Sequence, residues 1–189
     1  MEMTLRWYGS KFDTVTLKQI RQIPGVHGVI TTLYDTTPGE VWSRERIRAM
    51  KDEVEAAGLR VAGIESVNIS DDIKTAGPKR DEHIANYITT LERLGQADIH
   101  MVCYNFMPVF DWTRSRLDQP LADGSNALVY YKEDVDKMDP TKMTLPGWDA
   151  SYSPDEISGL VNAYKEIGEE GLWANLEYFI KEIMPVAIE

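Results

Sequence analysis

The sequence predicts an α/β protein built on a parallel sheet. Four apolar segments with the length of strands begin at residues 3, 26, 60 and 99 (Met3–Trp7, Val26–Thr32, Arg60–Ile64 and Ile99–Tyr104). Segments with the apolar periodicity of helices separate them. Strands that alternate with helices form serial βαβ units, in which neighbouring strands run parallel with right-handed connections.

Capping residues set the ends of the first two helices. Thr16 and Gln19 form a capping box for a short helix over Leu17–Ile23, which a Pro-Gly pair stops. Ser43 caps the second helix, which Gly58 ends and which carries one apolar stripe (Ile47, Met50, Val54 and Ala57).

The remaining helices are separated by polar segments. A polar loop that closes at Gly77 precedes the third helix, Asp81–Leu94. A serine, a proline and an acidic first turn start a helix over Glu156–Ile167. A last helix carries an apolar face from Trp173 onward, and we expect Pro185 to kink or end it.

No regular pattern connects Arg114 to Ser153. This region contains turn formers and the acidic segment 132–136, so we expect turns and solvated chain there. A loop of this length in a compact domain is usually functional or disordered. We therefore predict one domain, residues 1–189, with a long loop insertion at about 105–152.

The strand ends favour a barrel over a doubly wound sheet. No Gly-x-Gly-x-x-Gly motif follows any predicted strand, and each strand leads into a loop with polar or aromatic side chains. A closed parallel (β/α) barrel of the TIM type has about eight strands, and this sequence provides four. We therefore expect about the first four β/α units, a half barrel with two unpaired edges.

Composition excludes several classes of partner. The net charge is −11, from 20 basic and 31 acidic residues, with no basic run, so we expect neither nucleic acid nor membrane partners. The start does not have the pattern of a signal peptide, and a cytoplasmic location is expected. Cys103 is the single cysteine, which rules out an intrachain disulfide.

The segment Val102–Arg114 has the composition of a pocket wall. It begins as an apolar strand and continues into an amide, a carboxylate, an indole, a hydroxyl and a guanidinium, with Pro108 opposing a helix. The alternative is a large aromatic-rich loop that packs on itself.

Several motifs together resemble the N-terminal half of mannonate dehydratase. They are Arg6-Trp7-Tyr8-Gly9, Gln22-Ile23-Pro24-Gly25-Val26, Gly39-Glu40-Val41-Trp42, Glu65-Ser66-Val67-Asn68, Asp72-Ile73-Lys74, the run from Cys103 to Arg114, and Asp123-Gly124-Ser125-Asn126-Ala127-Leu128. The resemblance covers nearly the whole sequence. One departure is Tyr34, where the family often has histidine.

The resemblance implies a fold, a reaction and a metal. The fold is a barrel of the xylose-isomerase-like class. The reaction is that of a hydro-lyase of hexuronate and glucuronate catabolism, which converts D-mannonate to 2-keto-3-deoxy-D-gluconate and water. The family usually uses Mn²⁺ or Fe²⁺, and its His, Cys and Asp ligands are expected beyond Glu189.

The predicted substrate-binding residues lie at strand ends and in the adjoining loops. Arg114 is the preferred partner of the substrate carboxylate, with Arg6 and Arg116 as the other candidates. Glu65 is either a general acid or hydroxyl acceptor, or a carboxylate bound to loop amides. The complete set is Trp7, Tyr8, Tyr34, Glu65, Asn105, Asp111, Trp112 and Arg114.

Other candidate residues favour structural roles. Trp7 is also interpreted as a packing residue, and Cys103 as a small apolar one. We expect His27, His83 and His100 to be structural, because strand entrances and a first helical turn face away from the catalytic end of a barrel. No residue is assigned as the catalytic acid or base.

The predicted function is that of an N-terminal mannonate dehydratase fragment, inactive alone, which takes an acid sugar as its small-molecule substrate. Two alternatives stay open: a sugar isomerase or epimerase of the same barrel class, and a non-catalytic half barrel that self-associates. Since the open sheet edges favour pairing, we also expect a homo-oligomer.

Overall fold

The computed structural model describes residues 2–107, 114–137 and 153–188. They belong to two compact units, one made of Met1–Phe106 with Trp173–Glu189 and the other of Met107–Leu172. The first unit carries a parallel sheet and the second a small antiparallel hairpin. The insertion predicted at about 105–152 falls mostly within the second unit.

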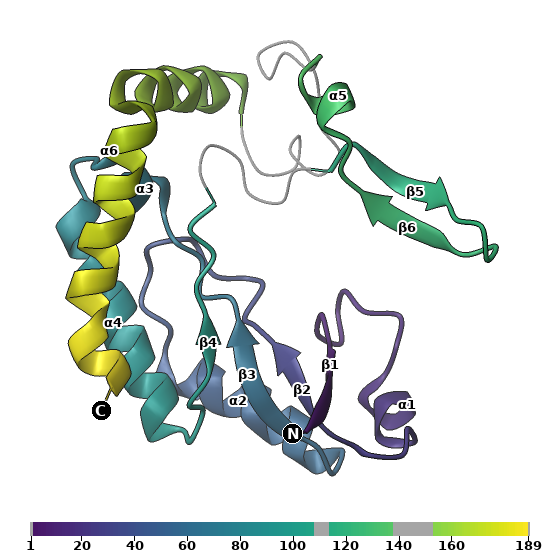
Figure 1. The fold of residues 1–189 in the computed structure, drawn as a ribbon. Coiled ribbons are helices and arrows are strands. Elements are labelled where there is room, and N and C mark those ends of the chain that lie inside the picture. Colours follow the sequence, from purple (N-terminus) through teal and green to yellow (C-terminus); the bar gives the residue numbers. More distant parts are fainter. Residues whose placement is uncertain (1, 108–113, 138–152, 189) are drawn as a thin grey trace. The chain divides into compact units, whose positions relative to one another are not determined.

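The parallel sheet has the strand order β1-β2-β3-β4 (Figure 1). Its strands are β1 Met3–Arg6, β2 Val26–Thr31, β3 Arg60–Glu65 and β4 Val102–Cys103. Each connection leads to the adjacent strand, and every pair is parallel. The predicted α/β fold with a parallel sheet is confirmed.

Strand β4 is shorter than the predicted Ile99–Tyr104, so that prediction was wrong in extent. Only Val102 and Cys103 pair with β3. The Ile99 amide still donates to the Leu94 carbonyl at the end of the preceding helix, at 3.0 Å. A residue held by a helix end cannot extend the strand, which explains the difference.

Four helices connect the strands: α1 Leu17–Arg21, α2 Arg44–Ala56, α3 Asp71–Thr75 and α4 Arg80–Gln96. The capping box of Thr16 and Gln19 is present in both directions, as predicted. Helix α3 was predicted as a polar loop. It has five residues, too few for a periodic apolar pattern, and ends at Ala76 in the left-handed conformation.

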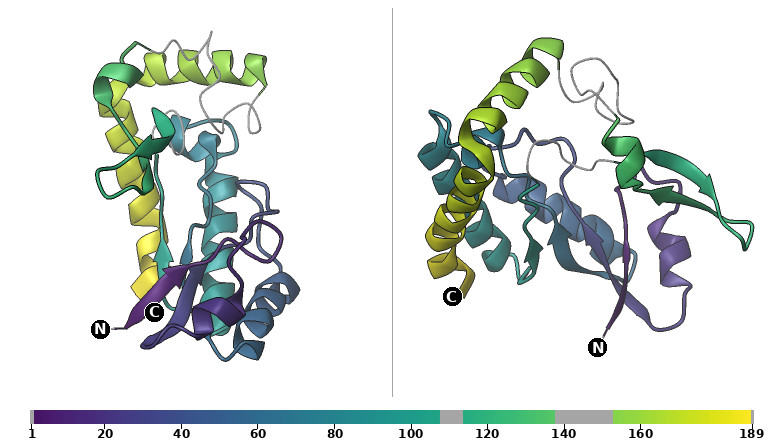
Figure 2. Two further views of the ribbon diagram at one scale, coloured as in Figure 1. Left: turned by 90° about the vertical axis from the view of Figure 1, so that its right-hand side faces the viewer. Right: turned by 45° about the horizontal axis from the view of Figure 1, so that its top comes forward.

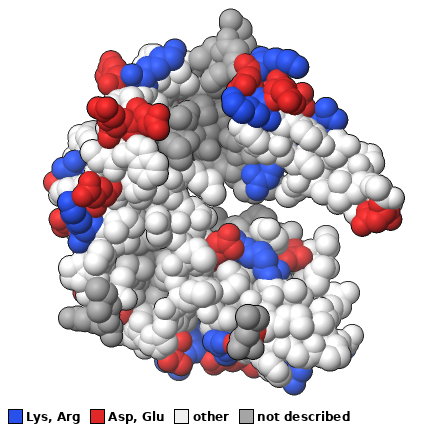
Figure 3. Space-filling view, in the orientation of Figure 1, with Lys and Arg blue, Asp and Glu red and all other residues white. Residues whose placement is uncertain are grey.

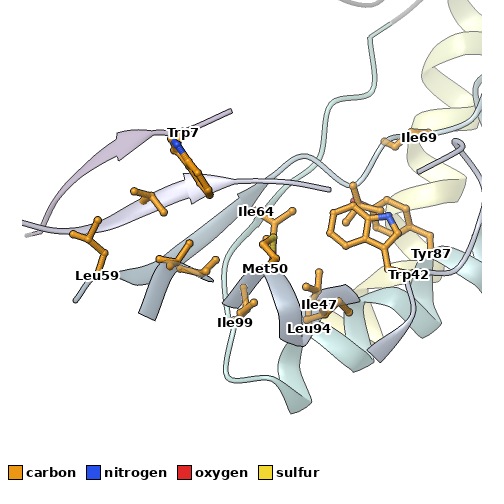
Figure 4. Packing of buried hydrophobic residues seen from close by; sticks show 14 of the residues in the cluster. Trp7, Trp42, Ile47, Met50, Leu59, Ile64, Ile69, Tyr87, Leu94 and Ile99 are labelled. Carbon is orange, nitrogen blue, oxygen red and sulfur yellow. The ribbon is translucent and has the colours of Figure 1, made fainter. Parts of the chain in front are cut away.

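Helices α2 and α4 bury their apolar stripes against the sheet. Figure 4 shows Ile47 and Met50 of α2 close to Ile64 of β3, which is fully buried. Val54 of α2 and Leu94 of α4 are also fully buried in this core. The stripe predicted for α2 is therefore the contact surface that attaches this helix to the sheet.

Helix α6 spans Pro154–Ile188 and is interrupted at Gly168, where φ is 64° and ψ is −179°. The two predicted helices are therefore present, with the break at a glycine. In the first unit, α6 lies alongside α4 (Figure 2), and Phe179 meets Tyr87 edge to face with ring centroids 5.1 Å apart. Of the two outcomes expected at Pro185, a kink or an end, the helix does not end there: Pro185 lies inside α6, which continues to Ile188.

The second unit contains an antiparallel hairpin, β5 Arg116–Pro120 and β6 Asn126–Val129, followed by α5 Lys132–Val135. This corrects the prediction of turns and solvated chain after Arg114. The strands were missed because apolar residues such as Leu117 and Leu128 remain exposed and Pro120 argues against a strand. The turn at Asp123 was predicted, and its carboxylate accepts from the Ser125 amide at 3.0 Å.

Charged side chains are mixed in sign on the face shown in Figure 3. Lys and Arg lie beside Asp and Glu there, and the described residues of this face form no broad basic area. Within the described ranges, no helix has the length and apolarity needed to cross a membrane.

Candidate active site

The carboxyl ends of β1, β2 and β3 bring three polar side chains into contact. Arg6 Nη2 donates a hydrogen bond to the Tyr34 hydroxyl at 2.8 Å. Arg6 Nη1 lies 3.4 Å from Glu65 Oε2. These residues are far apart in sequence, and the parallel order of the strands places them at one edge of the sheet.

Strand alternation explains why Arg6 and Glu65 share a face. Arg6 is paired with Ile30, and Ile30 with Gly63. Paired residues point to the same side of a sheet, and Glu65 lies two residues beyond Gly63. Trp7, the next residue on the chain, points to the opposite side and is buried in the core.

The loop between β1 and α1 adds an aromatic wall. The Asp13 carboxylate accepts from the amides of Tyr8 at 3.0 Å and Val15 at 2.8 Å, and Gly9 adopts a φ of 85°. This compact turn places the Tyr8 ring 6.0 Å from the Tyr34 ring and 5.1 Å from the Arg6 guanidinium. Arg6 is thus covered on one side by an aromatic face.

Burial and charge act in opposite directions on Tyr34. Burial of the half-buried ring raises the pKa of the Tyr34 hydroxyl, and the nearby Arg6 guanidinium opposes this rise without cancelling it. The phenol therefore keeps its proton at neutral pH. The Arg6 and Glu65 side chains are 25% and 48% exposed, so this ion pair remains accessible to solvent and to ligands.

Of the predicted substrate-binding residues, the structure brings Tyr8, Tyr34 and Glu65 together. Trp7 is only 3% exposed, and its indole N–H donates to the Val15 carbonyl at 3.2 Å. The packing interpretation of Trp7 therefore describes its position. Asn105 lies two residues after the end of β4, at the same carboxyl edge of the sheet.

The other predicted residues lie elsewhere in the chain. Asp111 and Trp112 are outside the described residues, and Arg114 belongs to the second unit. Arg116, another candidate for the carboxylate, is paired with Asp134 at 3.2 Å within that unit. The prediction ranked Arg6 below Arg114, although its position between the partly buried Leu5 and the buried Trp7 was an available signal.

A cavity of about 280 Å³ adjoins this cluster. Trp7, Tyr8, Phe12 and Tyr34 contribute its aromatic lining, and Arg46 of α2 lies at its wall. Arg46 also forms an ion pair with Asp35. The two rings nearest to Arg6, those of Tyr8 and Tyr34, therefore also line this cavity.

The described residues do not provide a metal site. Among them, no group of three or more His, Cys, Asp or Glu side chains is arranged to hold an ion. His27 and His100 are exposed near strand entrances, and His83 Nδ1 lies 2.7 Å from Ser70 Oγ. Cys103 is paired in register with Glu65 and is partly exposed.

Comparison with known proteins gives consistent matches. The profile of the D-mannonate dehydratase (UxuA) family matches residues 1–189. Mannonate dehydratases from Brachyspira hyodysenteriae and Streptococcus agalactiae are 54% and 53% identical in sequence to this chain. The two matches cover 98% and 99% of its length. The chain spans about half the length of these relatives, 55% and 54%.

A solved structure agrees with the sequence matches. The crystal structure of mannonate dehydratase from Streptococcus suis serotype 2 superimposes with a TM-score of 0.86 at 47% identity. The match covers 99% of this chain and 50% of that one. The parallel strands and the residues at their ends therefore have counterparts in an enzyme of known structure, and this chain belongs to the D-mannonate dehydratase family.

Proposed function

We propose that this chain provides the sugar-acid-binding side of a mannonate dehydratase, which converts D-mannonate to 2-keto-3-deoxy-D-gluconate and water. The observation that carries the proposal is the match over almost the entire chain, at about half identity, to enzymes with that name. The strand-end cluster of Arg6, Tyr34 and Glu65 supplies groups suited to a polyhydroxylated acid. The protein would act as a lyase of hexuronate catabolism.

The same proposal extends to the fold. Four parallel strands in sequential order, with helices between them, are what half of a (β/α) barrel would contain. In such a barrel the active site lies at the carboxyl ends of the strands. The cluster of Arg6, Tyr34 and Glu65 lies at that end. A homo-oligomer and a cytoplasmic location stay predictions from the sequence.

The described residues would bind and orient the substrate. Dehydration removes the proton at C2 and the hydroxyl group at C3, so it requires a base, an acid and stabilisation of negative charge near the carboxylate. Arg6 supplies a fixed positive charge, and Glu65 accepts hydrogen bonds from hydroxyl groups. Mn²⁺ or Fe²⁺ stays a family-based prediction, and no step is assigned to it because the described residues do not form its site.

Turnover assays test this proposal. The purified 189-residue chain is incubated with D-mannonate and Mn²⁺, alone and mixed with the separately expressed second half of the Streptococcus suis enzyme. We expect no turnover and no tight Mn²⁺ binding by the chain alone, and turnover with loss of one water in the mixture. Conversion without loss of water would favour an isomerase. Robust activity of the chain alone would contradict the proposal that this chain provides only the substrate-binding side of the active site.

A further inference from the structure

The hydrogen bond between Arg6 and Tyr34 fixes the direction in which the phenol can donate. A guanidinium group only donates hydrogen bonds, so the Tyr34 oxygen is the acceptor of the 2.8 Å bond from Arg6. The phenolic proton must therefore point away from Arg6. Within the described part of the chain, no acceptor for that proton lies within hydrogen-bond distance.

Arg6 itself keeps unused donors. A guanidinium group carries five N–H groups, and among the described residues Arg6 donates one hydrogen bond to Tyr34 and one to Glu65. The Glu65 contact is long, at 3.4 Å, and the Glu65 side chain is 48% exposed, so water and ligands compete with it. Arg6 and Tyr34, joined by a hydrogen bond of 2.8 Å, thus each keep donor capacity, one charged and one neutral.

An acceptor adjoins these donors. Glu65 projects from the same sheet face, and its carboxylate accepts hydrogen bonds that a ligand hydroxyl would donate. Two donors beside one acceptor match a carboxylate that carries a hydroxyl on the neighbouring carbon. A neutral polyol would leave the guanidinium with only the long contact to Glu65 as an anionic partner among the described residues, whereas a carboxylate adds a second one.

We propose that Tyr34 and Arg6 together recognise the carboxylate of the sugar acid, and that Glu65 accepts from a hydroxyl of the same molecule. This assignment rests on the proposed function, and it makes Arg6 the residue that determines the preference for an acid over a neutral sugar, with Tyr34 as a second donor. Burial keeps the pKa of the Tyr34 hydroxyl above its ordinary value, which maintains the donor in its protonated form.

Ligand titrations of the whole 189-residue chain test the assignment. Wild type, Arg6→Gln, Tyr34→Phe and Tyr34→His are titrated by NMR with D-mannonate and with its neutral amide, in EDTA. We expect Arg6→Gln to weaken D-mannonate binding at least about tenfold and to abolish the preference for the acid. Tyr34→Phe should weaken binding about three- to tenfold.

Two comparisons separate recognition from packing. Tyr34→His retains an N–H donor and should bind D-mannonate within about twofold of wild type. Arg48→Gln is the matched control for Arg6→Gln, because the Arg48 side chain is 83% exposed and lies on α2. It should leave binding unchanged. Amide spectra of each variant report whether it is folded.

Each outcome has a defined meaning. If wild type binds D-mannonate and Tyr34→Phe binds it equally well, the assignment is overturned and the proposed function stands. A loss in Tyr34→Phe that Tyr34→His does not recover indicates a packing role and also overturns the donor assignment. If wild type binds no D-mannonate, the proposed function fails together with this inference.

Discussion

Removal of the Phe179 side chain should destabilise the first unit strongly. Phe179 lies on α6, far along the chain from the sheet, yet it is fully buried and contacts Tyr87 of α4 edge to face. A buried Phe→Ala change costs about 3–5 kcal/mol, of which the ring pair accounts for about 0.5–1.5 kcal/mol. The last part of α6 is therefore expected to be a structural component of the sheet-bearing unit.

Urea unfolding followed by far-ultraviolet circular dichroism measures the effect of Phe179→Ala. With a slope of about 2–3 kcal/mol per molar urea, a loss of 3 kcal/mol lowers the midpoint by roughly 1–1.5 M. Trp173→Ala is the control, because Trp173 lies on the same helix and is 64% exposed, so it should change stability by less than about 0.5 kcal/mol.

A milder variant covers the case in which Phe179→Ala does not fold. Phe179→Leu keeps most of the buried volume and should cost less than about 1.5 kcal/mol. Equal midpoints for Phe179→Ala and Trp173→Ala would refute the packing of α6 against α4 described above.

Three further predictions concern single positions. The Thr90 hydroxyl is fully buried and accepts a hydrogen bond from the Trp42 amide at 3.2 Å. Thr90→Val should therefore lower the free energy of unfolding in urea by about 1–3 kcal/mol, and Thr90→Ser should lower it much less. Equal losses in the two variants would contradict this role of the hydroxyl. The Tyr34 phenol, whose pKa burial raises above 10.0, should titrate at a higher pH than an unperturbed phenol in the absorbance difference between wild type and Tyr34→Phe. Because the folded state holds this proton more tightly than the unfolded chain does, its contribution to stability is present below pH 10 and is lost as the pH rises further. Gly39 has a φ of 90°, and an added Cβ would lie 2.8 Å from the His83 ring. In the control Gly124→Ala the Cβ meets open space, so that variant carries only the backbone strain of about 1–2 kcal/mol. Gly39→Ala should therefore lower the melting temperature more than Gly124→Ala does. A smaller loss in Gly39→Ala than in Gly124→Ala would show that the His83 ring moves aside without cost.

The sequence predicted those parts of the fold that depend on local patterns. The starts of β1, β2 and β3 follow from apolar runs, and the capping box at Thr16 follows from two side chains three residues apart. The hairpin β5–β6 was missed because its exposed leucines resemble neither a buried nor an alternating strand. The sequence did not decide between a kink and an end at Pro185, because a proline in a last turn removes a single bond and need not stop the helix.

The sequence also predicted part of the candidate active site. Tyr8, Tyr34 and Glu65 were expected at the strand ends because loops after parallel strands gather at one edge. The central position of Arg6 depends on register, since its pairing with Ile30 decides which face it shares with Glu65. Register between distant strands is a tertiary property, and no single segment of sequence determines it.

The most direct test of the central claim is a map of D-mannonate binding on the wild-type chain. Amide chemical shifts are recorded while D-mannonate is added to the labelled protein. We expect shifts to change at the carboxyl ends of the strands, around Arg6, Tyr34 and Glu65, and not at the opposite end, around His27 and Asp98. Unchanged shifts at the carboxyl ends, or changes confined to the opposite end, would contradict it.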